Sequence, residues 1–294
     1  MRGLIPEVIT QALQGTSWQA FLILAALGCM GGFLAGLLGI GGGMVLVPFM
    51  AMIFSAAAMA PDKILHVAIA TSTATIMFTS LSSVRAHHKR GAVLWPVVAV
   101  LAPGIVVGAL IGAQVASALP TVWLTLGFAI FLAASATQLL LDRKPNGARD
   151  LPGRAGMFGA GSAIGFISSL VGAGGGFISV PFMTWCNVNI RQAVATSAAL
   201  GFPIAAAGAV GYVVAGVRES GPMPPGNLGF INVPALVAVV VTSVFFAPLG
   251  ARAAHRLPVR SLKRIFGTML YFLAAYMFYR ASIALHAPAT PVQS

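Results

Sequence analysis

Two runs of consecutive glycines, each followed by a proline, are the residues of this sequence that most clearly indicate a binding site. The segment Gly32–Met50 reads GFLAGLLGIGGGMVLVPFM, and Gly165–Met183 reads GFISSLVGAGGGFISVPFM, so more than half of the positions are identical. Glycine permits positive φ, and a proline inside a helix removes a hydrogen-bond donor. Each run therefore predicts a break in a helix, at 39–48 and at 172–181.

A helix that restarts after such a break has unpaired N–H groups and the positive end of its dipole at its first turn. Two such starts could form a site for a small anion, made of backbone. The candidate binding residues are Gly41, Gly42, Gly43, Gly174, Gly175 and Gly176. The alternative is that the glycines only let helices pack closely, and Gly32, Gly36 and Gly39 fit that simpler role.

A second pair of matching segments follows the breaks. His66-Val-Ala-Ile-Ala-Thr-Ser72 resembles Arg191-Gln-Ala-Val-Ala-Thr-Ser197. The candidate hydroxyl donors to a bound oxyanion are Thr71, Ser72, Thr196 and Ser197. Alternatively, each hydroxyl bonds to a carbonyl of its own helix. His66 and Arg191 hold equivalent positions just before these turns, where each could attract an anion or simply reach toward the membrane interface.

The elements that must position these residues are membrane helices. The chain of 294 residues is 58% apolar and only 7% charged, whereas a soluble domain carries about 25% charged residues. Residues 8–61 and 91–141 contain no Asp, Glu, Lys or Arg. A spanning helix needs about 20 apolar residues, so each stretch holds about two passes. The sequence therefore predicts an all-α polytopic membrane protein.

The net charge of +12 does not indicate nucleic-acid binding, because the basic residues gather in short loops between apolar segments. The members of the three loops are Arg85, Lys89 and Arg90; Arg143, Lys144, Arg149 and Arg154; and Arg252, Arg256, Arg260, Lys263 and Arg264. Loops of this kind lie on the cytoplasmic face. We therefore expect a multi-pass protein of the bacterial inner (plasma) membrane, with the lipid bilayer and no nucleic acid as partners.

The matching halves divide the chain into a first transmembrane repeat at 1–146 and a second at 147–294, each with four hydrophobic elements. If every element of the second repeat crossed the membrane, the basic loop at 252–264 would lie opposite the other two. A re-entrant hairpin at 156–186 returns it to the cytoplasmic face. Each repeat then consists of a broken hairpin plus three transmembrane helices. The two repeats are therefore expected to be inverted, with a binding site at their interface near the midplane.

The residue types that are missing narrow the function. The acidic residues, all at expected loops or helix ends, are Glu7, Asp62, Asp142, Asp150 and Glu219. Proton relays and many cation sites use a carboxylate inside the membrane, so both are disfavoured. The sequence has no GxxxxGK[ST] motif, no nucleophile–base pair and no cluster with metal-ligand spacing. We expect no enzyme activity, no cofactor and no metal.

These features together resemble the TauE/SafE family of membrane transporters, also called sulfite exporters. The resemblance rests on Gly36–Gly43 with Pro48, on Gly172–Gly176 with Pro181, and on the two Ala-Thr-Ser turns. It implies movement of sulfite, an organosulfonate or a related small sulfur-containing anion across the inner membrane. We hypothesise a secondary transporter that works by alternating access. The alternatives are a passive anion channel and a non-transporting membrane subunit, and a homo-oligomer is compatible with each.

Overall fold

A computed structural model describes residues 18–39, 42–57, 59–141, 150–219, 226–254 and 259–286. In these residues the chain is helical apart from one short hairpin of β1 (Asn227–Leu228) and β2 (Ile231–Asn232). The helices are α2 (Trp18–Leu38), α3 (Gly43–Ala56), α4 (Ile64–His88), α5 (Trp95–Ala118), α6 (Thr121–Leu141), α7 (Arg154–Val171), α8 (Gly176–Trp185), α9 (Ile190–Arg218), α10 (Val233–Ala253) and α11 (Val259–His286). The all-helical prediction is confirmed.

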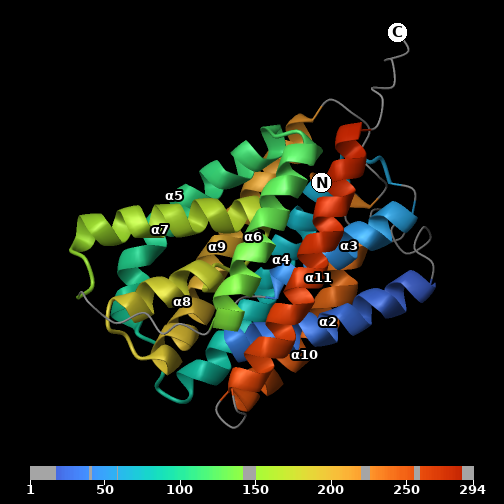
Figure 1. The fold of residues 1–294 in the computed structure, drawn as a ribbon. Coiled ribbons are helices and arrows are strands. Elements are labelled where there is room, and N and C mark those ends of the chain that lie inside the picture. The colour runs from blue at the N-terminus through green and yellow to red at the C-terminus, as the bar shows by residue number, and fades with distance from the viewer. Residues whose placement is uncertain are drawn as a thin grey trace, which may run out of the picture.

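Six of the described helices are long and apolar enough to cross a membrane: α4, α5 and α6 in the first half, and α9, α10 and α11 in the second. The remaining four form two interrupted elements, α2 with α3 and α7 with α8, and each interruption falls at a predicted glycine run. Figure 1 places α2 and α3 on one side of the bundle and α7 and α8 on the other. The chain is therefore a multi-pass membrane protein with one broken element per half.

The first interrupted helix packs along the third element of the opposite half. Residue numbers increase in the same direction along the contact between α2 and α10. The contact pairs are Gly28 with Val239, Gly32 with Ser243 and Gly36 with Ala247. The two helices are therefore parallel. A Cβ at Gly36 would meet the carbonyl oxygen of Ala247, so only glycine allows this approach. The close-packing role expected for Gly32 and Gly36 is confirmed.

The second interrupted helix repeats this arrangement with its counterparts. On α7, Gly161 lies against Leu101 of α5, and Gly165 lies against Ile105 one turn further on. These helices are also parallel, so α7 begins at the same end of the bundle as α5. The pairing is reciprocal, since the broken element of each half packs on the third element of the other.

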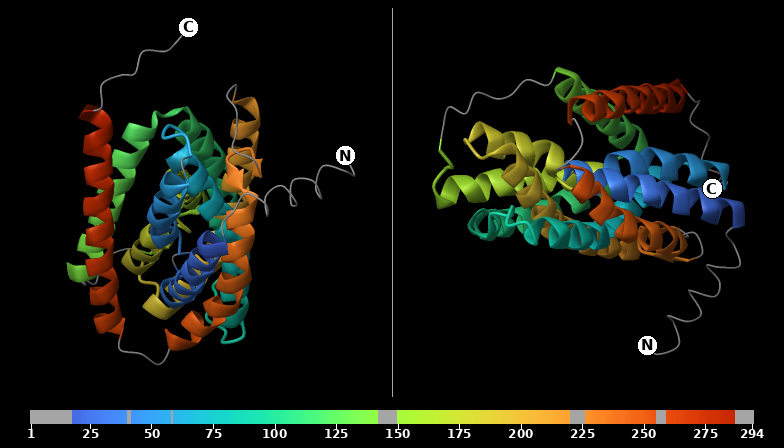
Figure 2. Two further views of the ribbon diagram at one scale, coloured as in Figure 1. Left: turned by 90° about the vertical axis from the view of Figure 1, so that its right-hand side faces the viewer. Right: turned by 90° about the horizontal axis from the view of Figure 1, so that it is seen from below.

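The equivalent second and fourth elements of the two halves also pack on each other, α4 on α9 and α6 on α11. Figure 2 shows α6 and α11 as an outer pair along one side of the bundle. The other helices enclose α4, whose most apolar stretch is 83% buried, compared with 28% for α11. The residues after the two breaks on α4 and α9 therefore lie at the centre of the molecule.

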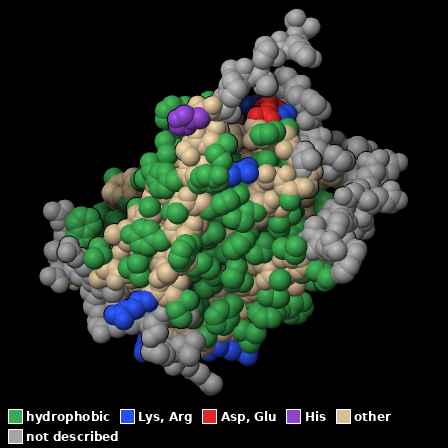
Figure 3. Space-filling model, turned by 45° about the vertical axis from the view of Figure 1, so that its right-hand side comes forward, with side chains coloured by type: hydrophobic (Ala, Val, Ile, Leu, Met, Phe, Trp, Pro, Cys, Tyr) green, Lys and Arg blue, Asp and Glu red, His purple; other side chains and the backbone are tan. Residues whose placement is uncertain are grey.

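The surface agrees with a position across a membrane. On the face in Figure 3, hydrophobic side chains form a broad band, Lys and Arg lie at the lower edge, and a mixed acidic and basic group lies at the top. The described acidic residues, Asp62, Asp150 and Glu219, are all exposed and outside the helices. Lys63 and Glu219 form an ion pair of 4.0 Å at one such edge.

Candidate functional site

The two glycine breaks have the same backbone shape. Gly39 and Gly42 have φ of 68° and 75°, and the matching Gly172 and Gly175 have φ of 59° and 74°. Gly42 and Gly175 are the N-cap residues of α3 and α8, and neither helix start receives a side-chain cap. The first N–H groups of both helices consequently lack an intrahelical acceptor. Of the candidate glycines, Gly41 lies outside the described residues.

Each break reverses the chain into a hairpin. A Cβ at Gly42 would lie 2.5 Å from the carbonyl oxygen of Gly31, which belongs to the incoming helix α2. In the second break, a Cβ at Gly175 would lie 3.2 Å from the Ser168 hydroxyl of the incoming α7. The outgoing helix α3 therefore returns beside α2, whereas α8 lies against α7 only near the break. A helix is thus interrupted at the predicted glycines in each half.

The two hairpin tips meet at the centre of the bundle. Gly43, the first residue of α3, abuts the carbonyl oxygen of Gly172 in the other break, where a Cβ would overlap that oxygen. Gly39 and Gly174 line one and the same pocket. Gly43, Gly174 and Gly176 are all buried. The candidate glycines that the structure describes therefore form one cluster, contributed by both halves.

The serines of the Ala-Thr-Ser turns fasten each break from the opposite half. Ser72 donates to the carbonyl of Gly172 at 3.2 Å, and Ser197 donates to the carbonyl of Gly39 at 2.9 Å. Ser179 of α8 donates in turn to the Ser197 hydroxyl at 2.9 Å. Both serine protons are therefore engaged by backbone carbonyls in this conformation. Neither serine bonds to its own helix; in this conformation each bonds to the break of the opposite half.

The threonines of the same turns hold the third elements in place. The Thr71 hydroxyl accepts from the backbone N–H of Asn232, the N-cap residue of α10, at 2.9 Å. The Thr196 hydroxyl accepts from the N–H of Leu94, the N-cap residue of α5, at 3.0 Å. Both contacts are again reciprocal between the halves. The turns thus connect each second helix to the opposite break and to the opposite third helix.

His66 and Arg191 occupy different environments although their sequence positions are equivalent. His66 is buried and stacks on Phe230, and its Nε2 faces the carbonyl of Leu119 at 3.1 Å. Arg191 is exposed at the start of α9, where its backbone N–H donates to the Asn189 side chain. Of the two, Arg191 presents its charge to solvent, whereas His66 is enclosed by protein.

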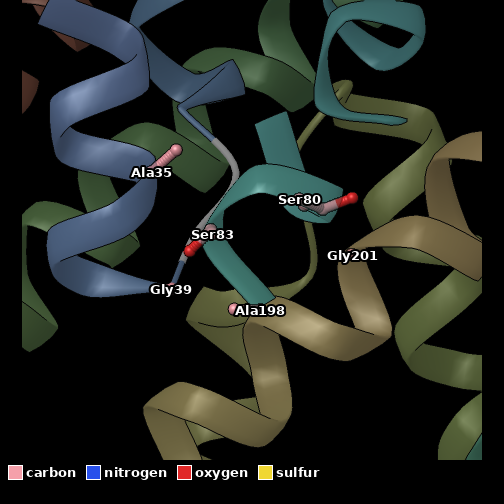
Figure 4. A pocket seen from close by; sticks show the side chains of 7 residues that line it. Ala35, Gly39, Ser80, Ser83, Ala198 and Gly201 are labelled. Carbon is pink, nitrogen blue, oxygen red and sulfur yellow. The ribbon is translucent and has the colours of Figure 1, made fainter. Parts of the chain in front are cut away.

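A small pocket lies between the breaks, lined by both halves. Its volume is about 10 Å³, which is about the space of one water molecule. Figure 4 shows it between the end of α2, the last third of α4 and the facing part of α9. The lining residues are Ala35, Gly39, Ser80, Ser83, Gly174, Ala198 and Gly201. No residue in this lining carries a charge.

Three buried serine hydroxyls near the breaks have no hydrogen-bond partner among the described residues: Ser83 on α4, and Ser168 and Ser169 on α7. Sequence reasoning did not select them, nor Ser80. A serine in a membrane helix normally bonds to its own helix, so the sequence does not indicate which serine lacks a partner. Only the hydrogen bonds in the structure distinguish Ser83 from its neighbours.

The fold and the site define a multi-pass membrane protein whose two halves pair broken helices around a central, uncharged pocket. The chain belongs to the sulfite exporter TauE/SafE family, whose family model matches residues 24–277. This is a family of membrane transporters, so the expectation that the chain is not an enzyme is confirmed.

Curated relatives match nearly the whole chain. A "Probable membrane transporter protein" of Haemophilus influenzae is 36% identical over 263 residues, covering 88% of this chain and 99% of its own length. "Probable membrane transporter protein YunE" of Bacillus subtilis is 27% identical over 280 residues, covering 88% of this chain and 98% of its own length. No solved structure matches the chain.

Proposed function

We propose that the protein is a secondary transporter of a small anion, sulfite, an organosulfonate or a related sulfur-containing anion, in the bacterial inner membrane. The observation that carries the proposal is the meeting of the two breaks, where Gly43 at the uncapped start of α3 lies against the carbonyl oxygen of Gly172, in the break that precedes the uncapped start of α8. Helix starts with unpaired N–H groups favour negative charge beside them.

The electrostatics of the centre favour an anion over a cation. Each described carboxylate lies outside the helices, so none can neutralise a cation at the breaks. A buried cation without a carboxylate would be strongly disfavoured in the membrane. The family name, sulfite exporter, supports the sulfur-containing class.

We propose further that the two repeats, 1–146 and 147–294, are inverted with respect to the membrane. The parallel packing of α2 on α10 and of α7 on α5 supports this, because each hairpin then starts at the face where its partner helix starts. With three crossing helices per repeat, the hairpins enter from opposite faces. In this proposal the three basic loops share one face, as the positive-inside rule requires.

Alternating access follows from this arrangement as the working mechanism. The residues that line the central pocket are buried, and its volume is about 10 Å³, so an anion can enter or leave only when helices move apart on one face. The two hairpins, held at their tips by Ser72 and Ser197, would exchange which face is open. In this proposal, Arg191 collects anions at the basic face, and the glycine N–H groups receive them.

Transport assays test this function directly. Purified protein in liposomes should take up radiolabelled sulfite or methanesulfonate with saturation. Unlabelled anion trapped inside should accelerate this uptake by counterflow. Linear flux without counterflow would instead establish the passive channel, and absence of any flux with a panel of sulfur oxyanions would refute transport of this class.

The topology has its own test. Cysteines introduced as Gly147→Cys and His255→Cys should both react with an impermeant thiol reagent added to the cytoplasmic face. Reaction from opposite faces would contradict the inverted arrangement while leaving the transport assay unaffected.

A further inference from the structure

We propose that the central pocket is the resting place of a singly charged oxyanion and that the Ser83 hydroxyl is its hydrogen-bond donor. This inference rests on the proposed transport function and deepens it. It adds a contact residue outside the glycine runs and the Ala-Thr-Ser turns, and it specifies the charge of the substrate.

Ser83 differs from the other polar residues of its helix. Along α4, the hydroxyls of Thr75, Thr79 and Ser80 each donate to a carbonyl of the preceding turn, at 2.9 to 3.3 Å. The Ser83 side chain is only 1% exposed, yet its hydroxyl has no partner among the described residues. Leaving a buried hydroxyl unbonded is unfavourable. The surface exposed to the pocket is apolar in this conformation, so the hydroxyl must turn toward the pocket to donate. A ligand that accepts its hydrogen bond there would remove the cost.

The surroundings of Ser83 suit an oxyanion. Ser83 shares the pocket with Gly39 and Gly174, one from each break, so a ligand beside Ser83 is also close to the starts of α3 and α8. The second break has another unpartnered hydroxyl, Ser168, next to the N-cap residue Gly175. Ser83 and residues of both breaks therefore border the same small space, and the uncapped starts of α3 and α8 follow within a few residues of Gly39 and Gly174. This space must widen to admit an anion.

The same surroundings favour a ligand with a single negative charge over one with two. All residues that line the pocket are neutral. On α4, Arg85 is exposed, and His87, one turn beyond Ser83, is buried with its Nε2 3.2 Å from the carbonyl oxygen of Gly36. The cost of moving an ion from water to the interior rises with the square of its charge, and neutral dipoles offset it far better for one charge than for two. We therefore infer that sulfonates or hydrogen sulfite bind, and that sulfate does not.

The first test requires no transport. Cys29 and Cys186 are replaced by alanine, and Ser83→Cys is compared with Ser243→Cys in liposomes treated with methyl methanethiosulfonate, a small neutral thiol reagent. Ser243 is a matched control, because it is fully buried and its hydroxyl donates to the Val240 carbonyl of its own helix.

The Ser83→Cys variant should react about tenfold faster than the control, since the pocket opens to water during alternating access. Methanesulfonate should slow the reaction, and sulfate at the same concentration should not. Equal rates in the two variants would overturn the assignment of the pocket. Protection by neither anion would do the same, and protection by both would overturn the charge limit.

The second test uses uptake of radiolabelled sulfite into liposomes. Ser83→Ala should raise the half-saturating concentration about tenfold, the effect of losing one hydrogen bond to a charged group. Ser243→Ala should leave this concentration unchanged. Unlabelled methanesulfonate should compete with the uptake, whereas sulfate should not.

The failures of the two proposals are distinguishable. If the wild-type protein takes up neither sulfite nor methanesulfonate, the transport function is refuted, while the thiol reaction still decides whether the pocket binds the anion. If wild-type uptake is normal and Ser83→Ala behaves like Ser243→Ala, the pocket assignment alone is wrong.

Discussion

The two breaks of this molecule have the same backbone conformation but different side chains around them. Their positive-φ glycines match position for position, and each is held by a serine of the other half. The side chains around them differ at equivalent sites. Ala35, Gly36 and Leu46 surround the first break, where Ser168, Ser169 and Ser179 surround the second; and α4 carries Ser80 and Ser83 where α9 has Ala205 and Gly208.

This difference separates two tasks. The glycine breaks and the serines that bond to them hold the two halves together. We call these contacts the frame, and both halves need them because each serine bonds to the break of the other half. The polar side chains differ between the halves, and those named above lie on α4, α7 and α8. The two halves thus have the same backbone arrangement around the pocket but different side chains. The hydroxyl groups available to a substrate therefore differ between the two sides of the pocket.

The contact between the two tips should be the most sensitive point of the frame. A Cβ at Gly43 would overlap the carbonyl oxygen of Gly172, and backbone on both sides cannot give way. We expect Gly43→Ala to destabilise the protein by about 3 kcal/mol or more, measured as loss of monodisperse protein on heating in detergent. Gly127→Ala on α6, where a Cβ meets open space, is the control and should melt like the wild type or slightly higher.

The two N-cap glycines should differ from each other. Both have positive φ, so alanine costs about 1–2 kcal/mol at either site. At Gly42 the new Cβ also meets the backbone oxygen of Gly31 at 2.5 Å, whereas at Gly175 it meets the flexible end of Ile204. Gly42→Ala should therefore lower the melting temperature more than Gly175→Ala. The reverse order would contradict the difference described for the two tips.

The two fastening serines should also differ. Ser197 accepts from Ser179 and donates to Gly39, whereas Ser72 makes one bond, to Gly172. Ser197→Ala should cost about 2 kcal/mol and Ser72→Ala about 1 kcal/mol. Thermal melting in detergent measures both changes. In a Ser179→Ala background, the Ser197→Ala penalty should shrink toward that of Ser72→Ala, and an unchanged penalty would argue against the coupled bonds.

The smallest structural effect is expected at Arg191. Its side chain is exposed, so Arg191→Gln should change stability by less than about 0.5 kcal/mol. If Arg191 attracts anions, this variant should weaken sulfite uptake at low salt and match the wild type at high salt, where exposed charges are screened. His66→Gln, at the equivalent buried position, should instead lower the melting temperature at every salt concentration. Salt-independent uptake by the wild-type protein would remove the role of Arg191.

Much of the frame could be predicted from the residues. Consecutive glycines with a proline five positions after the last of them indicate where a helix breaks, so the sequence predicts breaks at 39–48 and 172–181. The small residues Gly32 and Gly36 predicted close packing. The hydroxyl partners could not be predicted, because Ser197 reaches a carbonyl 158 residues away. No local pattern distinguishes that contact from a bond within its own helix.

The candidate site was predicted only in part for the same reason. The glycines of the two breaks do come together, but the pocket lining also includes Ser83, whose hydroxyl has no partner among the described residues. Ser83 differs from Thr79 and Ser80, which bond to their own helix. His66 and Arg191 are interchangeable by sequence position, yet one is enclosed by Phe230 and the other is open to solvent. Such differences arise from tertiary packing, which one sequence does not reveal.

The reciprocal bonds have a consequence for how the chain is made. The first break is synthesised 158 residues before the serine that closes it, and Thr71 appears 161 residues before the Asn232 that it holds. The hydrogen bonds that these residues of the first half make to the second half can therefore form only after the second half has been synthesised. It follows that an ancestor with a single repeat could have closed its break only by pairing with another copy of itself, and that two separately expressed halves of this chain should assemble.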